Sequence, residues 1–332
     1  RPRRAASHHD PAPAQVTDAG TTDAGHASRA RARMAKALAL GGYRTGAVAA
    51  RFVPGFVAAG LAAPFGAGAN LANAKRRALV ARHLQRVDPS LQGAQLRRAV
   101  QASFDSYATY FIESFRLPKL SSRTVERGLT IEGYDHVLAG LEMGNGVILA
   151  LPHLGGWEWG GRWVAAQGHT ITVVVERIDP PELFEWFAEL RAGLGMKVVP
   201  LGPSAGREVL AALRNNEVVC LLSDRDIDRS GIPVEFFGET TTLPAGPATI
   251  SLRTGAPVLP AAVYYTGRVD GHLGRVRPPI TIERSGKFRT DVITFTQTLA
   301  HEFEHLIRAA PSQWHLFQPN WPSDPGYDGK PR

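Results

Sequence analysis

A histidine and a carboxylate interrupt an apolar run in the segment LALPHLGGWEWGG, residues 149–161. His153 ends the run, and Glu158 follows five positions later. On a continuous helix this spacing turns two side chains about 140° apart, so they would not face each other. Gly155 and Gly156 lie between them and let the backbone turn. We therefore expect Glu158 to fold back and hold one ring nitrogen of His153 as a donor, which leaves the other nitrogen free as a general base.

The chain offers no obvious nucleophile to accompany this pair. No Gly-x-Ser-x-Gly elbow accompanies this pair, because the one match to that pattern lies far along the chain at residues 202–206. The single cysteine, Cys220, lies in the apolar run VVCLL, where a buried and inert thiol is expected. A base without a nucleophile indicates that the substrate brings one, most simply a hydroxyl that His153 deprotonates. Acyl transfer is one chemistry that fits. A single cysteine also excludes an internal disulfide and favours the cytoplasm.

Three apolar runs end in imidazole or charged side chains. VILAL is followed by His153, TVVV by Glu176 and Arg177, and VCLLS by Asp224 and Arg225. In open parallel sheets, ligands bind at the carboxyl ends of the strands, because the connecting loops converge there. We therefore expect His153 to be catalytic and the other four residues to line a substrate site.

Short apolar runs alternate with amphipathic stretches after residue 120. This pattern predicts an α/β fold with a mostly parallel central sheet flanked by helices. Arg191 lies in the 181–194 helix, from which it reaches the rim of the site. The predicted strands are 146–151, 170–175, 197–201, 218–223, 257–265 and a polar, alternating 280–284, and the predicted helices are 75–87, 93–115, 159–167, 181–194, 207–215 and 246–253.

Positive charge is concentrated in the first part of the chain. The net charge is +8, but residues 1–120 carry 18 Lys and Arg against 6 Asp and Glu. No residue from Val53 to Ala74 is charged, although two prolines and several glycines make this stretch a poor transmembrane helix. We expect broken amphipathic helices that dock on an anionic membrane surface. A helical layer that only packs on the core is the alternative, and the absence of a recognisable nucleic-acid motif argues against nucleic acid as a partner.

These observations divide the chain into four segments. Residues 1–28 are expected to be a disordered leader. Residues 29–120 are expected to be an N-terminal helical region that belongs to the same domain as the α/β core, residues 121–322. Residues 323–332 are expected to be a tail.

Three segments resemble the bacterial lysophospholipid and lipid A acyltransferase superfamily. They are the His-x4-acid segment HLGGWE, the long block SDRDIDRSGIPVEFFGETTTLPAGPATISLRTGAPVLP, and the closing PSQWHLFQPNW. Within this superfamily the chain looks most like the actinobacterial phosphatidylinositol mannoside acyltransferases. The likeness runs from about Leu40 to Trp321.

The resemblance implies a peripheral enzyme at the cytoplasmic face of the plasma membrane that moves a fatty acyl chain from acyl-CoA to a mannose hydroxyl of a phosphatidylinositol mannoside. Acyl-CoA is then a substrate, and no cofactor is implied. By the same likeness, His153 is the general base, Glu158 is its orienting acid, and Glu176, Arg191 and Asp224 line the site. Glu158 stands where the family usually has Asp, and Asp224 where the mannoside enzymes have Glu. Two alternatives remain, transfer to another lipid acceptor and a non-catalytic lipid-binding membrane protein.

The two carboxylates after VVCLLS are expected to differ in reach. On an extended chain, Asp226 lies roughly 6 to 7 Å beyond Asp224. We expect only one of them to contact His153, and the family match favours Asp224.

Two further segments match metal-binding motifs only in part. HEFEH, residues 301–305, has the zinc-protease spacing, but no Glu follows it and the position of a third His ligand is Pro311. DRDIDRSGIPVE, residues 224–235, has the acid spacing of a calcium loop, but Arg229 stands where the sharp turn needs Gly. We therefore expect no metal site.

Overall fold

The computed structural model describes residues 41, 53–177, 180–227 and 229–328. The expected leader, residues 1–28, lies outside the described residues, as do Asp228 and the last four residues of the expected tail. All structural statements below concern the described part.

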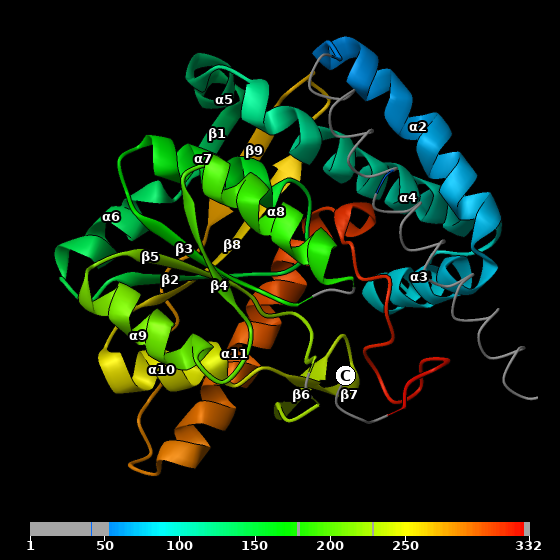
Figure 1. Ribbon diagram of the computed structural model, residues 1–332. Helices are drawn as coiled ribbons and strands as arrows, with labels where there is room; N and C mark the ends of the chain where they lie inside the picture. The colour runs from blue at the N-terminus through cyan, green and yellow to red at the C-terminus, as the bar shows by residue number, and fades with distance from the viewer. Residues whose placement is uncertain (1–40, 42–52, 178–179, 228, 329–332) are drawn as a thin grey trace, which may run out of the picture. The chain divides into compact units, whose positions relative to one another are not determined.

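The central sheet confirms the predicted α/β architecture. Seven strands from the described residues form one sheet in the order β1, β9, β8, β2, β5, β3, β4 (Figure 1). All neighbouring pairs are parallel except β8 and β9, which are antiparallel. The strands are β1 (Leu129–Glu132), β2 (Val147–Leu151), β3 (Ile171–Val175), β4 (Met196–Pro200), β5 (Val218–Leu222), β8 (Val258–Tyr265) and β9 (His272–Val276).

The predicted strand at residues 280–284 is wrong, because this stretch has no regular structure. Pro278 and Pro279 come directly before it and have no N–H to donate to a strand ladder. Only Arg277 and Ile280 donate backbone bonds to the edge of β8 here. The antiparallel hairpin of β6 (Ile232–Phe236) and β7 (Glu239–Leu243) was not predicted and lies outside the main sheet.

Helices cover both faces of the sheet, and the alternation along β8 shows how. The Tyr264 hydroxyl faces α11 and donates to the Leu306 carbonyl oxygen at 2.9 Å. The neighbouring Val263 faces α7, where Gly160 lies so close that a Cβ atom on it would be 2.8 Å from the valine. The covering helices are α5 (Ser122–Gly128), α6 (Tyr134–Glu142), α7 (Trp157–Ala166), α8 (Pro181–Gly193), α9 (Ala205–Arg214), α10 (Gly246–Thr254) and α11 (Phe288–Ala309), with 3-10 turns at η1 (Leu117–Lys119) and η2 (Pro311–Gln313).

The helices before the sheet are α2 (Gly55–Ala72), α3 (Ala74–Val87) and α4 (Gly93–Arg116). The expectation of broken helices is corrected for residues 55–72, because α2 is continuous and contains Pro64. Ala58, Ala62 and Gly66 are the buried residues of α2. They recur every four positions, and a Cβ atom on Gly66 would be 2.7 Å from the backbone of Asp105 in α4, so a stripe of small residues lets the two helices touch.

A buried segment without regular structure follows η2. Residues 314–324 contain no helix or strand, yet seven of these residues are almost completely buried. Backbone hydrogen bonds from Gly155 to Gln313 and from His315 to His153 join the beginning of this segment to the loop after β2. This segment therefore borders the carboxyl end of the sheet.

Candidate active site

Strand register brings His153 and Asp224 together. Leu151 at the end of β2 pairs with Leu222 at the end of β5. His153 and Asp224 each follow their strand end by two residues. Neighbouring strands lie about 4.8 Å apart, so the two side chains leave the same edge of the sheet side by side.

Asp224 holds the imidazole of His153. The Nδ1 atom of His153 lies 2.5 Å from Oδ1 of Asp224, and the backbone N–H of His153 donates to Oδ2 at 3.1 Å. The indole N–H of Trp314 donates to the same Oδ2 at 2.7 Å. Asp224 is completely buried, whereas the His153 side chain keeps 19% of its surface exposed. The dyad therefore presents its histidine, not its carboxylate, to solvent.

The electrostatics of this contact favour one tautomer. Burial would raise the pKa of Asp224, but the His153 charge and the hydrogen bonds from His153 and Trp314 outweigh it and hold the pKa below its usual value. An ionised Asp224 only accepts, so Nδ1 of His153 must be the donor. Its Nε2 has no hydrogen-bond partner among the described residues. This nitrogen is available to take a proton from a bound group.

Glu158 does not hold His153, so the expected partner of the histidine is corrected. Glu158 lies in the first turn of α7 and accepts hydrogen bonds from Arg191 Nη2 at 2.6 Å and from the Tyr110 hydroxyl at 3.1 Å. The donor nitrogen of His153 is already taken by Asp224. The local spacing in HLGGWE does allow the turn, because Gly155 adopts a φ of 61° that strains other residues.

Arg191, Glu158 and Tyr110 form a second buried cluster. Burial would lower the pKa of Arg191, but the adjacent Glu158 carboxylate raises it above its ordinary value. Burial and the same carboxylate raise the pKa of Tyr110 well above its ordinary value, so this hydroxyl stays protonated and donates to Glu158. Trp157 stacks on Tyr110 at 4.2 Å and meets His153 edge-on at 5.8 Å. The cluster therefore packs against Trp157, which lies beside His153, and it does not hold a ring nitrogen of the histidine.

The remaining predicted residues gather at the ends of β3 and β5. Arg225 forms an ion pair with Glu176, which joins the two strand ends. Arg177 lies with its guanidinium carbon 5.8 Å from the ring centre of Phe184 in α8. All three are at the edge of the sheet that carries His153 and Asp224, where a substrate would be met by charged side chains.

The weaker candidates have structural partners. Asp226 accepts a backbone hydrogen bond from Gly231 at 2.7 Å and closes a turn. Burial raises the pKa of the Cys220 thiol to about 12, which keeps it protonated and unreactive. In the HEFEH segment, Glu302 pairs with Arg277 and Glu304 with Arg308. No group of three potential metal ligands occurs in the part of the chain that the structure describes.

Sequence reasoning missed Trp314, Tyr110 and His315 as parts of the site. The backbone N–H of His315 donates to the His153 carbonyl oxygen at 2.7 Å. Burial, reinforced by the nearby His153, lowers the pKa of His315 to about 3, so this ring is neutral. The PSQWHLFQPNW segment was singled out only by resemblance. Trp314 lies 90 residues after Asp224 in the chain, so no local sequence pattern predicts these contacts.

Comparison with known proteins defines the class. The family of bacterial lipid A biosynthesis acyltransferases matches residues 40–323. The chain belongs to this family and is an acyltransferase.

Individual relatives narrow the comparison. The chain is 38% identical over 288 residues to a phosphatidylinositol mannoside acyltransferase of Mycolicibacterium smegmatis, covering 85% of this chain and 91% of the relative. It is 43% identical over 228 residues to a phosphatidylinositol mannoside acyltransferase of Mycobacterium tuberculosis strain H37Rv, covering 67% of this chain and 70% of the relative.

The two acids after β5 provide a direct test of the dyad. We expect Asp224→Asn to lower the acyl-transfer rate by about 100-fold or more, because the imidazolium formed during reaction loses its buried counter-charge. Asp224→Glu should keep measurable activity because it retains a carboxylate. Asp226→Asn is the matched control, since it is also buried but contacts Gly231, and it should cost much less. Steady-state rates of the folded variants decide this, and a larger loss in Asp226→Asn would contradict the assignment.

Proposed function

We propose that this acyltransferase moves a fatty acyl chain from acyl-CoA to a mannose hydroxyl of a phosphatidylinositol mannoside, with His153 as general base. The observation that carries the chemistry is the buried Asp224 carboxylate on Nδ1 of His153, which leaves Nε2 as the proton acceptor. The choice of acceptor is supported by the names of the two relatives. The acyl-CoA donor rests on the resemblance of the three sequence segments.

The reaction follows from the dyad in two steps. The acceptor hydroxyl gives its proton to Nε2 of His153 while its oxygen attacks the thioester carbonyl carbon. The tetrahedral intermediate then collapses, the carbon–sulfur bond breaks, and the imidazolium returns the proton to the departing CoA thiolate. Asp224 stabilises the imidazolium between these steps. The enzyme needs no nucleophile of its own, in keeping with the protonated Cys220.

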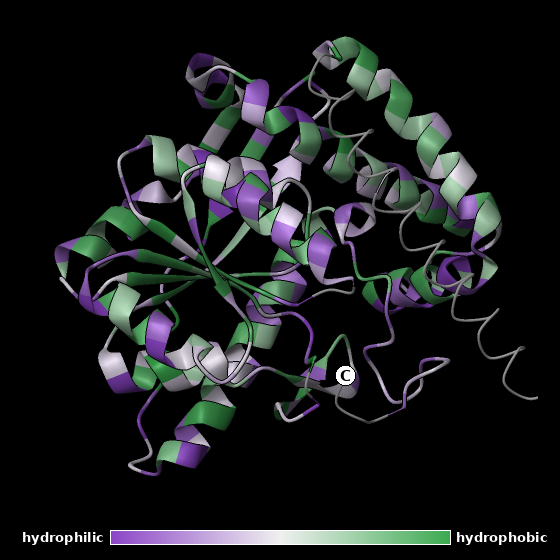
Figure 2. Ribbon diagram, in the orientation of Figure 1, coloured by the Kyte–Doolittle hydropathy of each residue, from purple (hydrophilic) through white to green (hydrophobic). Residues whose placement is uncertain are grey.

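A membrane surface is the proposed place of the reaction, at the cytoplasmic face of the plasma membrane. Among the described residues, α2 is the helix that is long and apolar enough to cross a membrane, and only 17% of it is buried. Figure 2 shows α2 as mostly apolar along its length. Because the small residues of α2 pack against α4, its large apolar side chains are exposed: Phe56 is 71% exposed, Phe65 62% and Leu71 80%.

Basic residues follow this apolar helix. Residues 53–120 contain nine Lys and Arg against three Asp and Glu. Lys75 and Arg76 lie in the first turn of α3, three and four residues after the end of α2, and are exposed. An apolar surface next to cationic side chains is what a peripheral protein needs to bind anionic lipid, because burial and charge attraction then add. We propose that α2 lies in the membrane interface and does not span the bilayer.

The chemistry is tested with palmitoyl-CoA and phosphatidylinositol mannoside as substrates. We expect His153→Ala to reduce transfer by about two to four orders of magnitude, the usual cost of a lost general base. His301→Ala, an exposed histidine on α11, is the control and should leave the rate unchanged. Near-full activity of folded His153→Ala would refute the role of His153.

Mass spectrometry of the lipid products tests the acceptor separately. Acylation of a different lipid, with the mannoside untouched, would overturn the acceptor and leave the transfer chemistry standing. Release of CoA without any acylated lipid, even with acceptor present, would count against transfer itself.

Membrane docking is tested by co-sedimentation with vesicles that contain anionic phospholipid. Phe65→Asp should weaken binding about tenfold or more, since burying a large apolar side chain contributes about 1.5 to 3 kcal/mol. Met143→Asp is the control, because Met143 is similarly exposed, at 61%, but lies after α6. Binding should also weaken as salt increases. Equal binding of both variants, or indifference to salt and to anionic lipid, would rule out this surface.

A further inference from the structure

The buried segment 314–324 carries two of the hydrogen-bond donors that meet Asp224. The Trp314 indole donates to the carboxylate at 2.7 Å, and the Asn320 side-chain amide donates to the Asp224 carbonyl oxygen at 3.4 Å. Backbone contacts fix the beginning of the segment, where Trp314 bridges Leu154 and His315 donates to His153. No helix or strand holds the rest of the segment, so side-chain anchors decide its position and the support behind Trp314 and Asn320.

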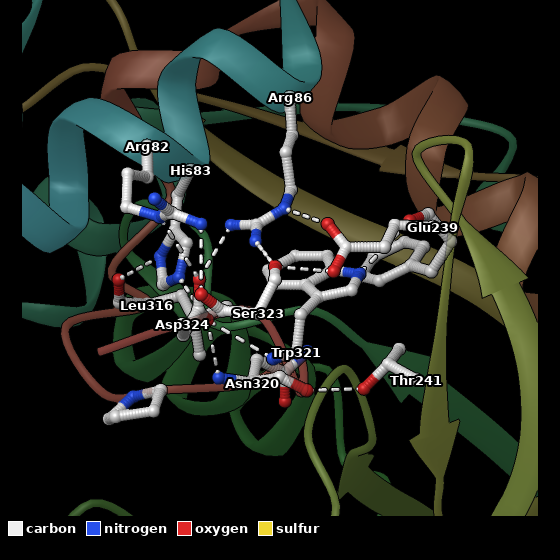
Figure 3. A network of polar contacts seen from close by, with 12 residues as sticks. Arg82, His83, Arg86, Glu239, Thr241, Leu316, Asn320, Trp321, Ser323 and Asp324 are labelled. Carbon is white, nitrogen blue, oxygen red and sulfur yellow. Dashed lines mark hydrogen bonds and ion pairs between the residues drawn. The ribbon is translucent and has the colours of Figure 1, made fainter. Parts of the chain in front are cut away.

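Asp324 is the central anchor of this segment. Its carboxylate is completely buried and accepts the backbone N–H groups of Asn320 at 2.8 Å and Trp321 at 3.1 Å. It also pairs with three side chains of α3: Nε2 of His83 lies at 3.0 Å, Nη1 of Arg86 at 2.8 Å and Nε of Arg82 at 3.8 Å (Figure 3). One carboxylate thus closes the 320–324 turn and ties it to a helix more than 230 positions earlier.

The negative charge of Asp324 is stabilised by its hydrogen-bond partners. Burial would raise the pKa of Asp324, but the hydrogen bonds from His83 and from the backbone of Asn320 hold it far below the usual range. His83 also contacts the same segment at a second point, because its Nδ1 lies 3.0 Å from the Leu316 carbonyl oxygen. The two ring nitrogens of His83 thus contact two acceptors of the segment, which joins its middle to its end.

The hairpin β6–β7 is joined to the same anchor. Arg86 donates to Glu239 at 2.9 Å and lies over the Trp321 ring, 4.3 Å from its centre. The Thr241 hydroxyl donates to the Asn320 carbonyl oxygen. Figure 3 shows these contacts converging around the 320–324 turn from α3 on one side and the hairpin on the other.

We propose that Asp324 is a positioning residue of the acyltransferase. Its carboxylate fixes segment 314–324, and through Trp314 and Asn320 the segment holds Asp224 where it orients His153. The rate effects of this role rest on the function proposed above, whereas the structural link from Asp324 to Trp314 does not.

The first test is Asp324→Asn, which keeps the shape of the side chain and removes its charge. We expect kcat to fall about 10- to 100-fold, since a displacement of about 1 Å at the reacting groups costs up to about 100-fold. The KM for palmitoyl-CoA should change less than about threefold. Glu239→Gln is the matched control. Glu239 shares Arg86 and accepts the exposed Ser323 hydroxyl, but it accepts no backbone N–H of the segment, and a glutamine can still accept both side-chain bonds, so the rate should stay near that of the unmodified protein.

A double-mutant cycle separates positioning from a general loss of structure. If Asp324 acts through Asp224, adding Asp324→Asn to Asp224→Asn should lower kcat by less than about threefold, because the contact that it positions is already lost. Independent effects, in which the two losses multiply in full, would overturn the proposal.

A spectroscopic measurement is independent of activity. In protein labelled with ¹⁵N-tryptophan, the indole resonance of Trp314, assigned with Trp314→Phe, should move in Asp324→Asn and stay in place in Glu239→Gln. If Asp324→Asn does not fold, His83→Gln, which weakens the same anchor, takes its place with the same expected shift. An unmoved Trp314 resonance in the folded variant would overturn the proposal. An unmodified protein that transfers no acyl group would refute the proposed function and leave this result interpretable.

Discussion

The site depends on one buried carboxylate, Asp224, shared between His153 and Trp314. An unpaired charge in such a place would cost several kcal/mol, and Asp224 remains ionised because donors from both residues surround it. The register of β2 against β5 sets where the carboxylate and the imidazole meet. The segment after η2 supplies the third partner, so an irregular part of the chain completes a site that a parallel sheet begins.

The carboxylates of Asp224 and Glu158 lie in different environments and therefore have different roles. Asp224 faces an imidazole that can gain and lose a proton, whereas Glu158 faces Arg191, which stays charged at all accessible pH values. Arg191 in α8 and Tyr110 in α4 both donate hydrogen bonds to Glu158 in α7. These contacts join the three helices beside the site. The His-x4-acid motif thus contributes its histidine to the proposed chemistry and its acid to the wall that supports the histidine.

Much of the fold could be predicted from the sequence, because strands covered on both faces read as continuous apolar runs such as VILAL in β2. β1 and β9 were not predicted, because each is only partly buried and its sequence is not a continuous apolar run. The strand ends located His153 and Asp224 correctly, but the partner of Glu158 could not be read from local spacing, since Arg191 lies 33 positions away. Asp324 fell in an expected tail, and only the three-dimensional structure reveals that it is buried.

The claim that Asp224 sets the tautomer of His153 is tested most directly by ¹⁵N NMR of histidine-labelled protein, with the His153 signals assigned from His153→Gln. At the pH of maximal turnover, the account predicts a neutral ring with its proton on Nδ1, shifted strongly downfield by Asp224, and an unprotonated Nε2. The Asp224→Asn variant should lose this downfield proton. A His153 ring with its proton on Nε2 in the unmodified protein would contradict the account.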